Sequence, residues 1–164
     1  MPKNKSLIQQ ALDEPCPVVY GFPESPKPFT DLPAVVLTFP APTKPESFNQ
    51  TAGKHWASSS VAKSKWVNAA VRVCLERADE LAVFRGHRVQ ITVAVPFPDR
   101  RRRDGHNYTP TVAKPLIDGM VRSGALVPDD NTTWVECLDP VLYFGELVRV
   151  RIRVASPSEN PEQW

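Results

Sequence analysis

Four stretches of the chain have the pattern of apolar and polar residues that predicts β-strands. Residues 34–39 are a β-branched, apolar run bounded by prolines, and residues 132–138 form another run of this kind. In residues 89–97 apolar side chains alternate at period two, which is typical of a strand with one buried side. Residues 148–154 alternate valine or isoleucine with arginine, so we expect one buried face and one basic face.

A long helix is predicted between residues 58 and 81. The serines at 58–60 suit an N-cap, and Gly86 ends the segment. Trp56 and Trp66, near the start of the helix, are more typical of packing residues than of base-stacking platforms. The residues that recur at helical spacing on one apolar face are Val67, Ala70, Val71, Cys74, Leu75, Ala78 and Leu81.

A second, shorter helix is predicted over residues 112–123. Pro115 fits only the first turn, because proline has no backbone N–H and cannot continue a helix interior. Gly124 fits the position just after the last turn, where a left-handed conformation is common. The apolar side of this helix contains Val112, Leu116, Ile117, Met120 and Val121.

Strands and helices in this order predict an α/β (α+β) fold, a small mixed β-sheet with two main helices packed on it. At 164 residues the chain is long enough for one domain with a substantial core. Many of its 18 prolines lie near the two ends. We therefore expect residues 1–33 to be a proline-rich extension that is partly disordered, residues 34–154 to be the folded domain, and residues 155–164 to be a disordered tail.

Overall composition excludes several classes of protein. The net charge is only +2, so a nucleic-acid role would have to rest on clustered charges. No apolar run approaches the ~20 residues of a membrane span, and the first residues lack the apolar segment of a signal peptide. Cys16, Cys74 and Cys137 have no metal-binding spacing, so we expect reduced, structural thiols and no zinc site.

Candidate chemistry lies in residues 98–130. Four consecutive arginines, Arg100 to Arg103, have the side chain that grips phosphates by forked, bidentate bonds. Asp104 follows at once, and His106 lies two residues further. If residues 104–106 are extended, both side chains project to the same face, a spacing that suits two ligands on one ion. A histidine that only makes hydrogen bonds is the alternative.

A pair of acids closes this region. Asp129 and Asp130 are either turn residues or metal ligands. Two adjacent acids repel unless a positive group lies beside them. Lys114 is expected to project from the start of the second helix, near Asp104 and His106. Arginines for phosphate and carboxylates for a divalent metal suggest chemistry on a phosphodiester, provided that the fold brings both ends of the region together.

This region resembles the RusA family of Holliday-junction resolvases. The shared features are PDRRRRD followed by an asparagine, a helix with Lys114 and Asp118 four residues apart, a glycine, and then two aspartates. The family contains small homodimeric endonucleases that are often phage-encoded, and this chain is similar to a phage or actinobacterial variant. The resemblance spans residues 34–154, and residues 98–130 are its specific part.

The family pattern can be placed on this chain residue by residue. In the motif D-x-D-N, Asp104 matches the first aspartate and Asn107 matches the asparagine, while His106 stands where the family has its second aspartate. Lys114 matches the family lysine if residues 108–113 contain a short insertion. Asp130 matches the distal aspartate, with Asp129 beside it.

The resemblance implies a set of site residues. The expected catalytic residues are Asp104, His106, Lys114 and Asp130. The expected metal ligands are Asp104, His106, Asp129 and Asp130. The expected DNA-binding residues are Arg100, Arg101, Arg102, Arg103, Asn107 and Lys114.

The resemblance also implies a cofactor and partners. Mg²⁺ is the expected cofactor, with Mn²⁺ as the alternative because imidazole suits manganese better than magnesium. The expected partners are branched DNA in the form of a four-way junction and a second copy in a homodimer, with no membrane and no nucleotide cofactor. A twofold dimer supplies the two symmetric nicks that such a junction needs. The expected location is the cytoplasm of a bacterium or of a phage-infected host cell.

The sequence therefore favours a metal-dependent, structure-selective endodeoxyribonuclease that resolves four-way junctions in recombination and repair. One alternative is a protein that binds branched DNA with weak or no cleavage, because His106 departs from the family pattern. Another is a purely structural α/β protein whose arginines make ion pairs. A different nuclease fits less well, since His55 and His87 are poorly spaced for an HNH site and no acid-x-lysine follows Asp99. The basic face of residues 148–154 is either a solvated edge or part of the DNA-facing surface.

Overall fold

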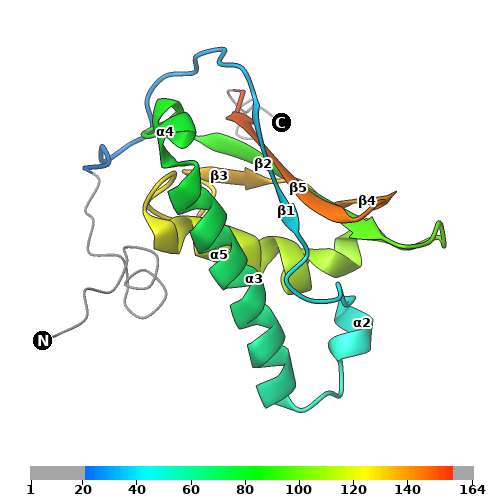
Figure 1. Cartoon of the computed structure of the whole chain (residues 1–164). Helices are drawn as coiled ribbons and strands as arrows, with labels where there is room; N and C mark the ends of the chain where they lie inside the picture. Colours follow the sequence, from blue (N-terminus) through cyan, green and yellow to red (C-terminus); the bar gives the residue numbers. More distant parts are fainter. Residues whose placement is uncertain (1–20, 157–164) are drawn as a thin grey trace, which may run out of the picture.

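A computed structural model describes residues 21–156, which form a mixed five-stranded sheet with helices packed on it (Figure 1). The strand order is β1-β5-β2-β3, and β4 also pairs with β2. The pairs β1–β5 and β5–β2 are antiparallel, whereas β3 and β4 are parallel to β2. The expected α+β fold is confirmed. The strands are β1 (Val35–Pro40), β2 (Val89–Phe97), β3 (Val135–Cys137), β4 (Val141–Phe144) and β5 (Leu147–Val154).

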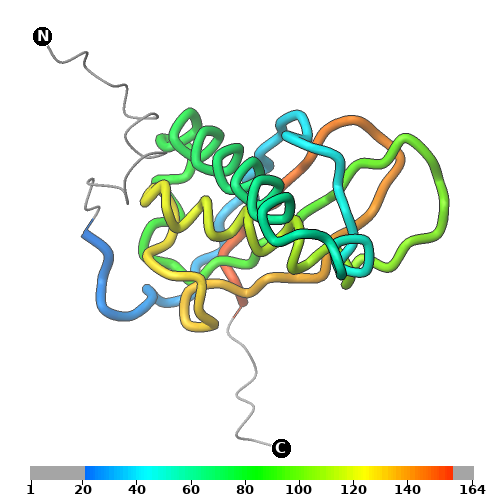
Figure 2. The backbone as a smooth tube through the Cα atoms, turned by 90° about the horizontal axis from the view of Figure 1, so that it is seen from below, coloured from blue at the N-terminus to red at the C-terminus, as the bar shows by residue number. Residues whose placement is uncertain are grey.

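Two main helices, α3 (Trp56–Glu76) and α5 (Lys114–Ser123), lie side by side in Figures 1 and 2. Their contact is close because Gly119 of α5 has no side chain: a Cβ there would collide with the carbonyl oxygen of Val67 and lie 2.6 Å from the Cβ of Ala70. The shorter helical segments are α2 (Phe48–Thr51), α4 (Ala78–Leu81), η1 (Ala82–Phe84), the 3₁₀ turn η2 (Gly105–Tyr108) and the π-helical turn η3 (Thr109–Ala113).

The core lies between these helices and one face of the sheet. Val89, Ile91, Val93 and Val95 of β2 are fully buried, as the period-two pattern predicts. The same holds along β5, where valine and isoleucine are buried and Arg149, Arg151 and Arg153 are exposed. The opposite face of the sheet therefore presents a row of arginines to solvent.

Two details of element position differ from the sequence analysis. Of the two alternatives for residues 148–154, the edge strand does not hold, because β5 pairs with β1 on one side and β2 on the other. The long helix begins at Trp56, before the serines, since Nδ1 of His55 accepts a hydrogen bond from the backbone N–H of Ala57 at 3.3 Å and caps the helix. Trp66 is buried as expected, but Trp56 is 75% exposed.

Other differences concern the shorter elements. Strand β3 begins only at Val135, because the backbone N–H groups of Trp134 and Val135 donate to the carbonyl of Asn131 and form a turn. Strand β4 has no counterpart in the sequence-based prediction. Helix α5 agrees with the prediction, with Pro115 in its first turn and Gly124 left-handed at φ +68° after its last.

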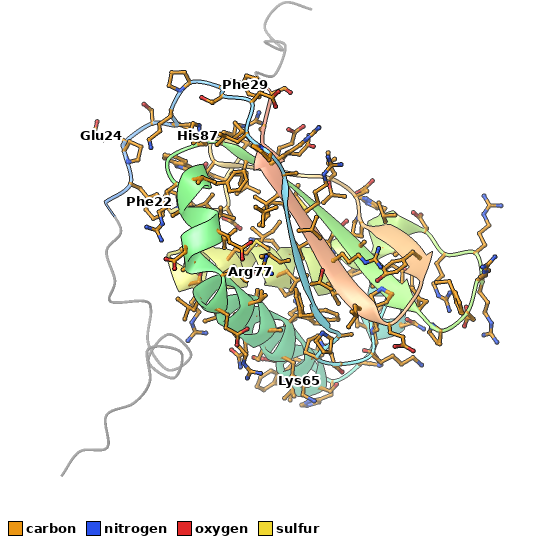
Figure 3. All side chains as sticks on the ribbon, turned by 45° about the horizontal axis from the view of Figure 1, so that its top comes forward. Phe22, Glu24, Phe29, Lys65, Arg77 and His87 are labelled. Atoms are coloured by element: carbon orange, nitrogen blue, oxygen red, sulfur yellow. The ribbon has the colours of Figure 1, made fainter. Side chains whose placement is uncertain are left out.

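Residues 21–33 run along the end of the molecule that lies away from residues 98–104. Figure 3 shows Phe22, Glu24 and Phe29 on this segment, with His87 nearby, and Lys27 forms an isolated parallel bridge with His87. The disorder expected for residues 1–20 and 157–164 falls outside the described residues, as does Cys16. Cys74 is a buried free thiol and Cys137 an exposed one. Within residues 21–156, no helix has the length and apolarity needed to cross a membrane.

Candidate functional site

Strand β2 leads directly into the arginine loop, which we define as residues 98–104 and which projects beyond the sheet (Figures 1 and 2). Inside this loop, the two carboxylate oxygens of Asp99 accept from Nη1 and Nη2 of Arg103 at 2.7 and 3.1 Å. The backbone N–H of Arg101 donates to the same carboxylate at 3.0 Å. The fork of Arg103, and then the N–H of Arg101, lower the pKa of Asp99 to about 2.

The four arginines therefore have different roles in the free protein. Arg103 is tied to Asp99, and its guanidinium also lies 4.1 Å from the ring centre of Phe97. Arg100, Arg101 and Arg102 are exposed, and Arg101 has only a long 3.9 Å ion pair with Asp99. The guanidinium groups of these three arginines are therefore accessible to solvent.

Asp104 caps the 3₁₀ turn η2 by accepting the backbone N–H of His106 at 3.1 Å. Residues 104–106 are consequently not fully extended, so the condition under which both side chains would share one face is not met. The ring of His106 turns instead to Asp139, with Nδ1 3.3 Å from Oδ1. Asn107 lies in the same turn and donates its backbone N–H to the carbonyl of Asp104 at 3.2 Å.

Asp139 is a site residue that sequence reasoning missed, because the Asp139-Pro140 pair has the pattern of a simple break. A close backbone approach brings it to His106: a Cβ on Gly105 would collide with the carbonyl oxygen of Pro140. The hydroxyl of Thr109 lies 3.5 Å from the same carboxylate oxygen. The sequence carried no signal for this placement, which follows from the pairing of both β3 and β4 with β2 on either side of residues 138–140.

Lys114 lies between two carboxylates. Its Nζ donates to Oδ1 of Asp118 at 2.6 Å and also bonds Oδ2 of Asp130. The structure therefore brings together Lys114 and Asp130, which the sequence placed 16 residues apart, and supplies the positive group that the paired acids require. Asp118 was not expected to belong to the site, although its i, i+4 spacing from Lys114 was visible.

Asp129 has a different environment from Asp130. One of its carboxylate oxygens accepts the backbone N–H of Asp130 at 2.7 Å, and the other accepts Nδ2 of Asn131 at 2.8 Å. These local bonds are typical of an aspartate that stabilises a turn. Asp129 is therefore a turn residue, whereas Asp130 belongs to the cluster with Lys114 and Asp118.

Cys137 is exposed as a residue, but its sulfur atom is partly covered. That partial burial raises the pKa of the thiol, the charge of Asp139 raises it further, and the charge of Lys114 lowers it.

The four expected metal ligands do not form one group in this structure. Across residues 21–156, no three His, Cys, Asp or Glu side chains lie close enough together to hold a metal ion. Asp118 and Asp130, however, converge on a single cation, the ammonium of Lys114. Mg²⁺ is commonly held by one or two carboxylates together with water and substrate phosphate. Asp118 and Asp130 are therefore the two carboxylates of this region that could serve as ligands of a divalent cation in place of the ammonium.

An open hollow of about 330 Å³ lies beside the arginine loop. Arg101, Arg102, Arg103, Asp104, Asn107 and Tyr108 line one side of it, and Ser47 and Gln50 from the α2 region line the other. The loop before α2 is held by the bond from the hydroxyl of Thr111 to the carbonyl of Glu46 at 2.5 Å. Asp104 and Asn107 thus share one concave surface with three of the arginines.

Comparison with protein-family models gives no match for this chain, and no curated protein matches it.

Proposed function

We propose that this chain is a metal-dependent endodeoxyribonuclease that cuts branched DNA, with the four-way junction as its substrate. The observation that carries the proposal is the convergence of Asp118 and Asp130 on Lys114, in a chain that also carries three exposed arginines in the loop that leads to His106. Carboxylates, a lysine and arginines are the groups that phosphodiester hydrolysis uses to hold a cation, stabilise charge and place the backbone.

The proposed mechanism assigns a task to each group. Asp118 and Asp130 would hold Mg²⁺, or Mn²⁺ as the alternative, and such an ion lowers the pKa of bound water and polarises the phosphoryl oxygen. Once released from the carboxylates, the ammonium of Lys114 would donate a hydrogen bond to the oxygen of the scissile phosphate or leaving group on which negative charge develops. Asp104 fixes the turn that places His106 and Asn107.

DNA binding is assigned to Arg100, Arg101 and Arg102, with Asn107 beside Arg101 and Arg102 in the hollow. Guanidinium forks suit phosphate oxygens, and Arg103 supports the loop from within through Asp99. A homodimer would carry two such sites related by a twofold axis, as two symmetric nicks require. Junction cleavage belongs to recombination and repair in a bacterial or phage-infected cytoplasm, which is part of the same proposal.

Nicking of a strand-labelled four-way junction, against linear duplex of equal length, tests the proposal with Mg²⁺ and Mn²⁺ in parallel. We expect paired, symmetric cuts in the junction alone. Asp130→Asn should abolish them, and Lys114→Met should slow them by roughly 100-fold or more. Asp104→Asn should remove the negative charge and keep the turn, since asparagine also accepts an N–H at a helix start. Its nicking rate therefore tests whether the charge of Asp104, as distinct from the turn, is needed for cutting.

The control variant is Asp31→Asn, an exposed loop residue outside the site, which should cut like the wild type. A preference for Mn²⁺ would implicate His106 as a ligand. Cutting of junction and duplex at equal rates would contradict the substrate assignment. Cutting that persists in the Asp130→Asn variant would contradict the assignment of Asp130 to the catalytic site.

A junction-binding protein without cleavage is the second candidate. The observation in its favour is that Lys114 already satisfies Asp130, and that His106 is paired with Asp139 rather than with Asp104. This candidate predicts tight junction binding with no cuts in either metal, and Asp130→Asn would leave that binding unchanged.

A further inference from the structure

Phe144 is an aromatic residue at the edge of the sheet with most of its ring in solvent. It ends β4, is 59% exposed and lies opposite Phe97 in the parallel register of β4 with β2. The next backbone N–H, that of Gly145, donates to the carbonyl of Phe97 at 3.1 Å. The ring is therefore carried by hydrogen-bonded backbone rather than by a free loop.

A hollow of about 320 Å³ opens beside this ring. That volume is at the lower end of the range for small-molecule clefts, which is the size class of a single nucleobase and not of a duplex. The residues that line it are Phe97, Asp99, Arg100, Arg101, Arg103, Leu142, Tyr143 and Phe144.

The walls of the hollow are basic. Three arginines face one aspartate, a formal balance of +2, and that aspartate is already engaged by Arg103. The guanidinium of Arg100 lies 5.4 Å from the ring centre of Phe144, and the side chain of Arg101 is 83% exposed. An aromatic face with adjacent arginines is the combination that binds unpaired nucleotides, the ring by stacking and the arginines through phosphate.

A protein partner is the competing occupant, because Val141 and Leu147 near Phe144 are also exposed. A second copy that packed this surface on itself about a twofold axis would bring Arg100 and Arg101 against the same residues of its partner. Like charges placed together disfavour that arrangement, whereas a polyanion complements it.

We infer that this hollow receives one unstacked nucleobase, with Phe144 as its stacking platform and Arg100 and Arg101 on the flanking phosphates. The inference rests on the proposed function and adds the substrate feature that is recognised, an unpaired or unstacked nucleotide at the branch point. Branched DNA offers such a nucleotide at lower cost than a continuous duplex, because its stacking is already interrupted.

The test measures junction affinity and base unstacking together. The substrate is a four-way junction with 2-aminopurine next to the crossover, and the buffer contains Ca²⁺ in place of Mg²⁺. The fluorescence of 2-aminopurine rises when this base leaves the stack. We expect the wild type to raise the fluorescence. Phe144→Ala should bind roughly tenfold more weakly and lose the rise. Phe144→Trp should retain the affinity, since an indole also stacks.

Phe29→Ala is the matched control, because Phe29 is also an exposed phenylalanine, at 46%, and lies on the segment of residues 21–33 away from the arginine loop. It should behave like the wild type. Sedimentation and circular dichroism of each variant check assembly and folding. Phe144 is solvent-exposed, so its substitution should leave both unchanged.

Two results would overturn the inference. One is Phe144→Ala that binds the junction and raises the fluorescence as the wild type does. The other is Phe144→Ala that changes the sedimenting mass, which would assign the surface to a protein interface. If the wild type nicks junctions but never unstacks the base, the role of Phe144 as a stacking platform is rejected and the proposed function stands. If the wild type does not bind junctions, both the role of Phe144 and the proposed function are rejected.

Discussion

Asp99 fixes the conformation of the arginine loop, because its carboxylate holds both the side chain of Arg103 and the backbone of Arg101. One negative charge thereby organises a run of four positive ones. Asp99 leaves Arg100 and Arg102 outside its own bonds, so the loop can be ordered and still present guanidinium groups to a ligand. The free energy of this arrangement depends on the ionised carboxylate.

Asp99→Asn should flatten part of the acid unfolding curve. The folded pKa of Asp99 is lowered to about 2 from an ordinary value of 3.8, so its stabilisation is present above about pH 4 and is lost as the pH falls towards 2. The free energy of unfolding, measured by urea titration at each pH, should fall less steeply between pH 4 and 2 in the variant. Asp31→Asn serves as the control and should follow the wild type. Equal slopes for wild type and Asp99→Asn would contradict the assigned role.

Residue patterns revealed some of the candidate site and hid the rest. The arginine run, the pair Lys114 and Asp118 at helical spacing and the acid Asp130 are all visible in the sequence. The bond from Lys114 to Asp130 and the pair of His106 with Asp139 depend on how distant segments pack. The orientation of His106 was predicted from an extended backbone, but Asp104 uses its carboxylate as a cap and bends the chain.

At the scale of elements, a prediction succeeded where a segment is long and buries one continuous stripe. Strand β2 and helix α5 are of this kind, and their ends follow from proline and glycine. Strand β4 has only four residues, of which Val141 and Phe144 are exposed, so it has no buried stripe to reveal it. Strand β4 is held in the sheet by pairing with residues 94–97 of β2.

Gly119→Ala should destabilise the protein, although alanine favours helices. The new methyl group would collide with the carbonyl oxygen of Val67 and with Ala70 where α3 and α5 cross. We expect a loss of about 1–3 kcal/mol in the free energy of unfolding, which exceeds the gain in helix propensity. Urea unfolding followed by circular dichroism measures it. Ser60→Ala on the exposed side of α3 is the control, and a stabilised Gly119→Ala would show that the helices are not in close contact.

At the scale of the whole molecule, the sheet separates an apolar face from a basic one. The helices cover the first, and Arg149, Arg151 and Arg153 of β5 occupy the second. Arg149 lies 5.1 Å from the ring centre of Tyr143, and Nε of Arg153 donates to Oε1 of Gln90 at 2.6 Å. Nε2 of the same glutamine donates to Glu136, so a negative charge lies near the Arg153 end of the row. The positive charge of the row is therefore least neutralised at Arg151 and Arg149.

Arg151→Gln should reduce the salt dependence of DNA binding if this face carries an arm of the substrate. Each lost phosphate contact lowers the slope of log K against log salt by about 0.9. Junction affinity measured by fluorescence anisotropy at several salt concentrations gives the slope. Arg72→Gln, at an exposed position on α3, is the control and should keep the wild-type slope. An unchanged slope for Arg151→Gln would make the row a solvated surface.

The central position of β5 has a consequence for how the protein is made. Strands β1 and β2 are not paired with each other; each pairs with β5, which comes after them in the chain. During synthesis both strands must wait, with apolar side chains uncovered, until the ribosome has released residues 147–154. A chain that stopped before residue 147 would therefore leave β1 and β2 without the strand that joins them, with unpaired backbone edges that favour aggregation.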